Sequence, residues 1–236
     1  MKKLFFGILV AGSIIFPTQA SAGSFIDLDG GFILRDIPDA DVENSTLKNA
    51  NKILDELWKS AVLMEESKLC IAEALEFDPR YINTSQEILR DLNFNRKDMN
   101  AIRKSIYHKM PEYELQARIE KLKTINDQTK SDQFSKLLKR SKDIRVAAYS
   151  YNSDAIGNIV KTLEMITNLH DINPSAEDRL NESFLSQIKD SCELLYYQRR
   201  QMKMFYKTFN AIEKKLNIET PSRKELKQIE REILPK

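Results

Sequence analysis

The residues that most often carry catalysis are few in this chain. His108 and His170 are the only imidazoles. Di-iron helical bundles need a glutamate three residues before each histidine, but Ser105 and Thr167 occupy those positions. We therefore interpret both histidines as surface or helix-capping residues.

Other catalytic and metal-binding patterns are missing from the sequence. It contains no G-x-S-x-G, H-E-x-x-H, glycine-rich phosphate loop or C-x-x-C pattern. Asp27 and Asp29 resemble the start of a calcium loop, but Phe32 stands where that loop requires glycine. We predict a protein that is not an enzyme, with no cofactor and no metal site, while a pair of distant carboxylates remains a possible hydrolase site.

The chain has two cysteines, Cys70 and Cys192. If the protein is exported to an oxidising compartment, one intramolecular disulfide can form between them. That bond would stabilise the fold by about 4–5 kcal/mol in the chain-entropy model, because it closes a long loop. We predict this disulfide; the alternative is two separate buried thiols.

Aromatic and basic residues alternate between positions 196 and 209. In a cytosolic protein this mixture would suggest nucleic-acid binding, which export disfavours. The two remaining interpretations are a core stripe flanked by basic residues and a docking face for an acidic partner or anionic lipid head groups. The candidate docking face consists of Tyr197, Arg199, Arg200, Lys203, Tyr206 and Lys207.

Residues 1–22 have the features of a secretory signal peptide. Lys2 and Lys3 precede a 13-residue apolar run, and residues 20–22 read Ala-Ser-Ala. The run is shorter than the about 20 residues that span a bilayer as a helix. We predict cleavage after Ala22, export to the bacterial periplasm or beyond, and no transmembrane segment in the mature chain.

The composition indicates a folded helical protein. Of the 236 residues, 42% are hydrophobic and 31% are charged, which is typical of a globular protein rather than a disordered one. Only six are glycine, which argues against sandwiches, barrels and doubly wound nucleotide-binding folds.

Apolar residues at three- and four-residue spacing dominate the sequence after position 45. The pattern predicts long amphipathic helices over 46–77, 132–170 and 176–217, with shorter helices between the first two and after the third. We predict an extended or irregular segment over 23–44 and one all-α domain over 45–236. The expected architecture is an elongated helical bundle of two or three long helices, with coiled-coil-like packing and a shorter-helix appendage.

Charge is distributed unevenly along the chain. Residues 23–80 contain 13 acidic and 6 basic residues, whereas residues 195–236 contain 5 acidic and 11 basic residues. The acidic beginning and the basic end can attract each other within one molecule or between two copies.

These features favour an exported helical protein that acts through protein–protein contacts, in assembly or as an adaptor. More specific alternatives are a minor pilus-tip-like subunit of a type IV secretion or conjugation system, similar in layout alone, and a periplasmic immunity or inhibitor protein. A helical carrier of a small apolar ligand is a further alternative. The sequence does not identify the protein partner.

Overall fold

The computed structural model describes residues 40–122, 128–172 and 182–235. In these ranges every regular element is a helix and there is no strand, which confirms the predicted all-α class. None of the helices there is both long enough and apolar enough to cross a membrane. The predicted signal peptide and most of the predicted irregular segment lie outside the described residues.

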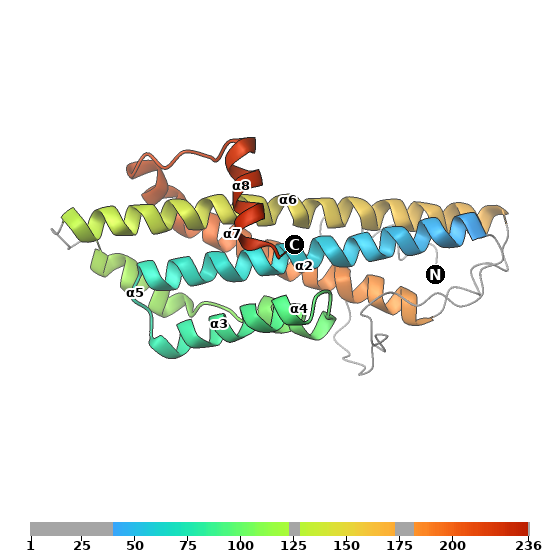
Figure 1. Ribbon diagram of the computed structural model, residues 1–236, viewed down its shortest axis with the longest axis horizontal. Coiled ribbons are helices and arrows are strands. Elements are labelled where there is room, and N and C mark those ends of the chain that lie inside the picture. The colour runs from blue at the N-terminus through green and yellow to red at the C-terminus, as the bar shows by residue number, and fades with distance from the viewer. Residues whose placement is uncertain (1–39, 123–127, 173–181, 236) are drawn as a thin grey trace.

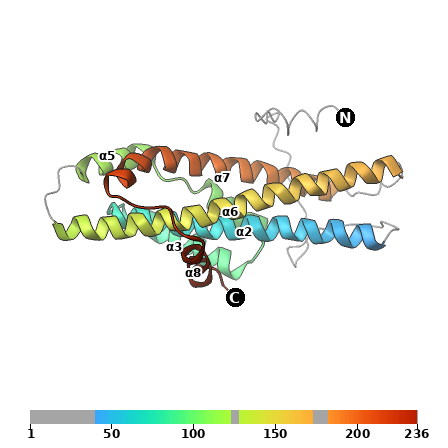
Figure 2. The ribbon, with the colours of Figure 1, turned by 90° about the horizontal axis from the view of Figure 1, so that it is seen from above.

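Three long helices form the body of the elongated molecule: α2 (Ala40–Ala74), α6 (Gln128–Ile172) and α7 (Glu182–Lys215). The views in Figures 1 and 2 show α2 and α7 running in the same direction and α6 running against both. All three match predicted long helices. However, α2 begins at Ala40, so residues 40–44, which we expected to be irregular, are helical.

Positive φ angles mark the ends of α2 and α7. Glu76 (φ 52°) follows α2, and Asn217 (φ 52°) follows α7. In each case the backbone N–H three residues beyond the last helical residue reaches back five positions, from Phe77 to Ala72 and from Ile218 to Glu213. This Schellman-type closure satisfies the last helical carbonyls. It ends α2 at Ala74, earlier than the predicted position 77.

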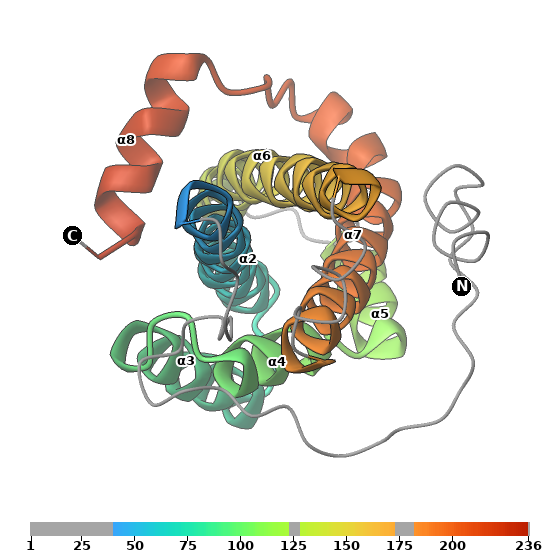
Figure 3. The same cartoon turned by 90° about the vertical axis from the view of Figure 1, so that its right-hand side faces the viewer.

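Shorter helices pack around this body. The appendage comprises α3 (Pro79–Phe94), α4 (Met99–Tyr107) and α5 (Glu112–Leu122), and α8 (Arg223–Ile233) packs on α6. Aspartate or serine caps three of their N-termini, as expected for residues that accept from free backbone N–H groups. Seen end-on in Figure 3, α4 lies between α2 and α7.

Small residues let α2 and α6 approach closely. Ser67 and Ser141 contact each other across the interface, with their Oγ atoms 2.8 Å apart. Ala61, Ala147 and Ala148 are fully buried nearby. The apolar core follows the long axis as two clusters, one around the first half of α2 and the other around its second half.

Candidate functional site

The predicted docking residues lie on α7, and the helix divides them between two faces. Arg200, Lys203, Tyr206 and Lys207 are exposed, and 64% of the Tyr206 surface is accessible. Tyr197 and Arg199 are half-buried because their side chains contact neighbouring helices. The structure therefore places only part of the predicted set on a free surface.

Five of the exposed cations of α7 form one row. When the exposed Tyr196 is counted with them, successive members are three, four or seven residues apart, which puts them on the same side of the helix. Within the described residues none of them forms an ion pair, and the exposed Tyr196 lies among them. We call this row the α7 basic stripe: Lys189, Arg200, Lys203, Lys207 and Lys214, together with Tyr196.

Arg199, which the sequence grouped with the docking residues, instead connects α7 to α6. Its Nε donates to Asn152 Oδ1 at 2.9 Å, and its guanidinium also donates to Ser153 Oγ at 3.0 Å. The same group lies over the ring of Tyr149. These contacts tie α7 to α6, so Arg199 belongs to the helix interface rather than to the α7 basic stripe.

Tyr197 joins a row of aromatic rings where α4 meets α7. Its ring packs edge-on against Tyr107 at a centroid distance of 5.5 Å and against Tyr196 at 6.0 Å. Tyr107 and Tyr196 are both partly exposed. Tyrosine is enriched at protein interfaces because it combines apolar area with a hydroxyl group. This row therefore borders the α7 basic stripe with contact surface suited to a protein partner.

The predicted Cys70–Cys192 disulfide is not formed, because both cysteines are free. Ser60 Oγ lies 2.8 Å from Gln198 Oε1, which fixes the register between the parallel helices α2 and α7. In that register the two cysteines are separated by about 16 residues along the bundle, or about 24 Å. A disulfide requires Cα atoms about 4–7 Å apart. The prediction failed because sequence separation carries no information about register.

Both thiols are also unreactive at neutral pH. Burial raises the pKa of Cys70 to about 12, with a further contribution from the carboxylate of Glu66. Burial alone raises the pKa of Cys192 to about 11. Since the thiolate is the reactive form, both residues behave as small apolar core groups at neutral pH.

A second constellation of polar groups lies inside the molecule, between α2 and the end of α4. Lys68 is only 1% exposed, and its Nζ lies 2.6 Å from Glu65 Oε2. The same ammonium group donates to the carbonyl oxygens of Ser105 (2.9 Å) and His108 (2.7 Å). All three of its donors are thereby used. Two of the acceptors are carbonyls at the C-terminus of α4, where a positive charge is favourable.

Glu65 is equally well satisfied. Its Oε2 also accepts from the Ser105 hydroxyl at 3.0 Å, and its Oε1 lies 2.7 Å from His108 Nδ1. An ionised carboxylate only accepts, so His108 Nδ1 carries the proton of this contact. The ring of Tyr81 on α3 stacks on His108 at 4.6 Å. We refer to Glu65, Lys68, Ser105, His108 and Tyr81 as the Glu65–Lys68 cluster.

The charges of this cluster stabilise each other. Burial by itself raises the pKa of Glu65, but the ammonium of Lys68 and hydrogen bonds from His108 and Lys68 outweigh it. The pKa of Glu65 is therefore below its ordinary value, and the carboxylate is ionised at neutral pH. Burial lowers the pKa of Lys68, and the charge of Glu65 opposes that shift. The ion pair and hydrogen bonds of this cluster therefore hold the end of α4 against α2.

Sequence reasoning found this cluster only in part. It predicted His108 as a surface or capping residue, and the structure places it at the C-cap of α4. It did not single out Lys68, which interrupts the apolar spacing of the predicted helix over 46–77. A glutamate three residues before such a lysine was the available signal. The side chain of His170 lies outside the described residues.

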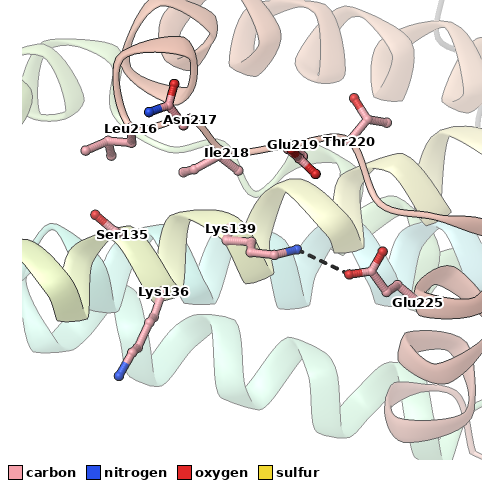
Figure 4. Close-up of a pocket in the computed structure, with 9 residues that line it drawn as sticks. All are labelled: Ser135, Lys136, Lys139, Leu216, Asn217, Ile218, Glu219, Thr220 and Glu225. Carbon is pink, nitrogen blue, oxygen red and sulfur yellow. Dashed lines mark ion pairs between the residues drawn. The ribbon is translucent and has the colours of Figure 1, made fainter.

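An open groove of about 370 Å³ lies between α6 and the linker that joins α7 to α8. Lys139 on its floor is paired with Asp143 at 2.8 Å and with Glu225 at 3.7 Å. Figure 4 shows Lys136 pointing away from the groove. Because the inward-facing cation already has acidic partners, the groove is a weaker candidate site than the α7 basic stripe.

Comparison with known proteins adds no further constraint. No family model, curated protein or solved structure matches the chain. In the part of the chain that the structure describes, no group of three or more His, Cys, Asp or Glu residues is arranged to hold a metal ion. The candidate site therefore depends on the geometry of α7.

Proposed function

We propose that this chain is an exported helical interaction protein that binds an acidic protein surface through the α7 basic stripe. The observation that carries the proposal is the row of exposed cations along one face of a long helix, none of which forms an ion pair with a residue that the structure describes. Several cations elsewhere have partners within the molecule: Lys68 with Glu65, Arg145 with Glu213 and Arg103 with Asp190. Unpaired charges on one face increase association rates and select partners of opposite charge.

Polar contacts across the bundle supply a rigid platform for this face. Asn152 donates to Gln198 Oε1 at 2.8 Å and accepts from Arg199, which joins α6 to α7. Gln201 donates to the carbonyl of Ile106 and so joins α7 to α4. A fixed helix presents its exposed side chains with less conformational entropy to lose on binding.

An acidic protein fits the stripe better than a lipid surface does. A helix that binds a membrane interface inserts its large apolar side chains between the lipids. In α7 those side chains face the core, where Leu195, Phe205 and Phe209 are at most 1% exposed. The exposed residues around the cations are tyrosines, which are typical of protein interfaces.

Two exposed lysine pairs allow a matched test of this proposal. The Lys203→Glu/Lys207→Glu variant reverses two charges of the stripe, and Lys224→Glu/Lys227→Glu makes the same change on the exposed face of α8. We expect the first variant to lose binding to poly-L-glutamate and to partners captured from the exporting cell, and the second to retain both. Equal loss in the two variants would contradict the proposal.

Anionic vesicles provide the discriminating probe. We expect phosphatidylglycerol-containing vesicles to bind the wild-type chain weakly and with little dependence on the stripe residues. Tight binding that disappears in Lys203→Glu/Lys207→Glu would replace the acidic protein with a lipid surface as the target.

Export is part of the same proposal and rests on the features of residues 1–22. We expect the chain recovered from the periplasmic or secreted fraction to begin at Gly23, which N-terminal sequencing of the purified protein would test. A chain that retains Met1 in the cytoplasmic fraction would contradict export.

A minor pilus-tip-like subunit is a second candidate, favoured by the layout of the molecule. The three long helices form a rod, and α3 and α4 lie together on one side of it (Figure 1). Such a rod with a lateral appendage suits stacking in an assembly. Cross-linking in the intact cell followed by identification of secretion or pilus components would support this candidate over a single-partner inhibitor.

A further inference from the structure

The central cations of the α7 basic stripe, Arg200, Lys203 and Lys207, have no acidic residue within four positions on either side. Arg200 and Lys203 are three residues apart, and Lys203 and Lys207 are four apart, so like charges are neighbours on the helix surface. Such pairs repel each other. Of the α7 acids whose side chains are described, Asp190 is paired with Arg103, Glu213 is buried against Arg145, and Glu193, near Lys189 at the start of the stripe, accepts from the Tyr107 hydroxyl. The row therefore favours an anionic occupant.

The chain itself contains a segment of the required chemistry. Residues 23–39, which precede α2 and lie outside the described range, carry four aspartates and one arginine. Between these charges they carry seven large apolar residues that match the exposed tyrosine rings of α7. These are Phe25, Ile26, Leu28, Phe32, Ile33, Leu34 and Ile37.

The geometry allows this segment to reach the stripe within one molecule. α2 and α7 run in the same direction, so the two helices begin at the same end of the bundle (Figures 1 and 2), and Ala40 is the first residue of α2. In the register set by Ser60 and Gln198, Arg200 lies about 33 Å along the axis from Ala40. Asp27 and Asp29 precede Ala40 by 13 and 11 residues, an extended reach of about 36 to 47 Å.

We infer that residues 23–39 of the same chain occupy the α7 basic stripe and compete there with the acidic partner. This inference rests on the proposed function for the identity of the competed site. Tethering keeps the local concentration of the segment high, so a partner must displace it. The segment thereby acts as a built-in regulator of binding.

Carbodiimide coupling tests the inference on the full-length mature chain, because it joins a carboxylate to a lysine amine only when the two are in contact. We expect links from Asp27 or Asp29 to Lys203 or Lys207 at low salt, and their loss at high salt. An equal mixture of chains with normal and heavy nitrogen identifies links between molecules. Absence of these links, or links predominantly between chains of different mass, would overturn the inference.

Two arginine variants serve as matched controls, since neither removes nor adds a carboxylate or an amine that couples. Arg200→Gln removes a positive charge from the stripe, and Arg223→Gln removes one from the exposed start of α8. We expect Arg200→Gln to reduce the yield of links to Lys203 and Lys207 several-fold and Arg223→Gln to leave it unchanged. An equal yield in both variants would overturn the inference.

Binding of poly-L-glutamate separates this inference from the proposed function. The Asp27→Asn/Asp29→Asn/Asp36→Asn variant keeps the full chain and its apolar residues. We expect it to bind poly-L-glutamate several-fold more tightly than the wild type. If the wild type and the variant bind equally well, the inference fails and the proposed function stands. If neither binds and the links are present, the segment still occupies the stripe, and the proposed function fails.

Discussion

The Glu65–Lys68 cluster and the α7 basic stripe both contain basic residues, but these residues stabilise the fold in the cluster and are free to bind a partner in the stripe. In the cluster a lysine is buried and each of its donors has an acceptor, so its charge fixes α4 against α2. In the stripe the cations are exposed and have no ion pair within the described residues. A buried charge must be paired or it destabilises the fold, whereas an exposed charge affects stability little and is available for binding.

Arg199 and Arg200 show the same difference between adjacent positions. Arg199 donates to Asn152 and Ser153 on α6, whereas Arg200 is exposed. A rotation of about 100° per residue separates the two side chains around α7. Burial and partners, rather than residue type, decide which basic residue holds the fold together. Four predictions test this comparison.

The largest effect is expected when Glu65 is removed. Glu65→Ala leaves the ammonium of Lys68 buried without its counter-charge, and we expect a loss of about 3–5 kcal/mol in the free energy of unfolding. Denaturant unfolding measures it. The control Glu73→Ala alters an exposed acid of the same helix and should change stability by no more than about 0.5 kcal/mol. If Glu65→Ala does not fold, Glu65→Gln provides a smaller change at the same position. A Glu65 variant as stable as the wild type would contradict the conclusion that the cluster stabilises the fold.

The pH dependence of the unfolding free energy is expected to reflect the ionisation of Glu65 in the same cluster. The pKa of Glu65 is lowered in the folded protein, so between that value and the unfolded value of about 4.3 the unfolded chain binds more protons. The stabilisation from Glu65 is therefore complete above this range and is lost as the pH falls through it. Burial raises the pKa of Glu66 and acts in the opposite direction.

Subtracting the profile of Glu65→Gln from that of the wild type isolates the contribution of Glu65. We expect the difference in unfolding free energy between the two proteins to shrink as the pH is lowered through the acidic range. A difference independent of pH would mean that Glu65 is not ionised in the folded protein.

A moderate effect is expected from Arg199→Ala. This change removes two hydrogen bonds to α6 and the contact with Tyr149, and we expect a loss of about 1–2 kcal/mol. Arg200→Ala is the matched control, with an expected change within about 0.5 kcal/mol. Denaturant unfolding of both variants provides the measurement. The reverse order of the two losses would contradict the assignment of faces.

The smallest effect on stability, and of opposite sign, is expected from Lys203→Glu. The new carboxylate lies four residues before Lys207, an arrangement that stabilises a helix by about 0.3 kcal/mol. The same change should weaken binding to poly-L-glutamate. Thermal unfolding and a binding titration on one sample compare the two effects. A variant that is less stable and binds normally would refute a binding role for this residue.

Much of the fold followed from the pattern of apolar residues. The three- and four-residue spacing predicted a long helix over 132–170, and α6 covers this range without a break at Asn152. The helix continues there because Asn152 is buried and bonds to Gln198 and Arg199 on α7. A tertiary contact, which no local sequence pattern reveals, thus holds a residue of low helix propensity in the helical conformation.

The sites were predictable only in part. The basic and aromatic composition near position 200 indicated a docking face, and four of its six residues are exposed. Lys68 went unrecognised because a lysine on an apolar stripe has no visible partner beyond its own helix. Its acceptors on α4 lie about forty residues away in the chain.

The sequence by itself determined that the chain forms long amphipathic helices, that its beginning is acidic and its end basic, and which side chains share a helix face. These properties depend on composition and on the 3.6-residue period, which are local. Only the tertiary structure decided that Cys70 and Cys192 are too far apart to bond, that Lys68 meets the end of α4, and that Arg199 faces inward. Helical periodicity fixes the angle of a side chain around its own axis, but the register and the choice of neighbour arise from packing between helices.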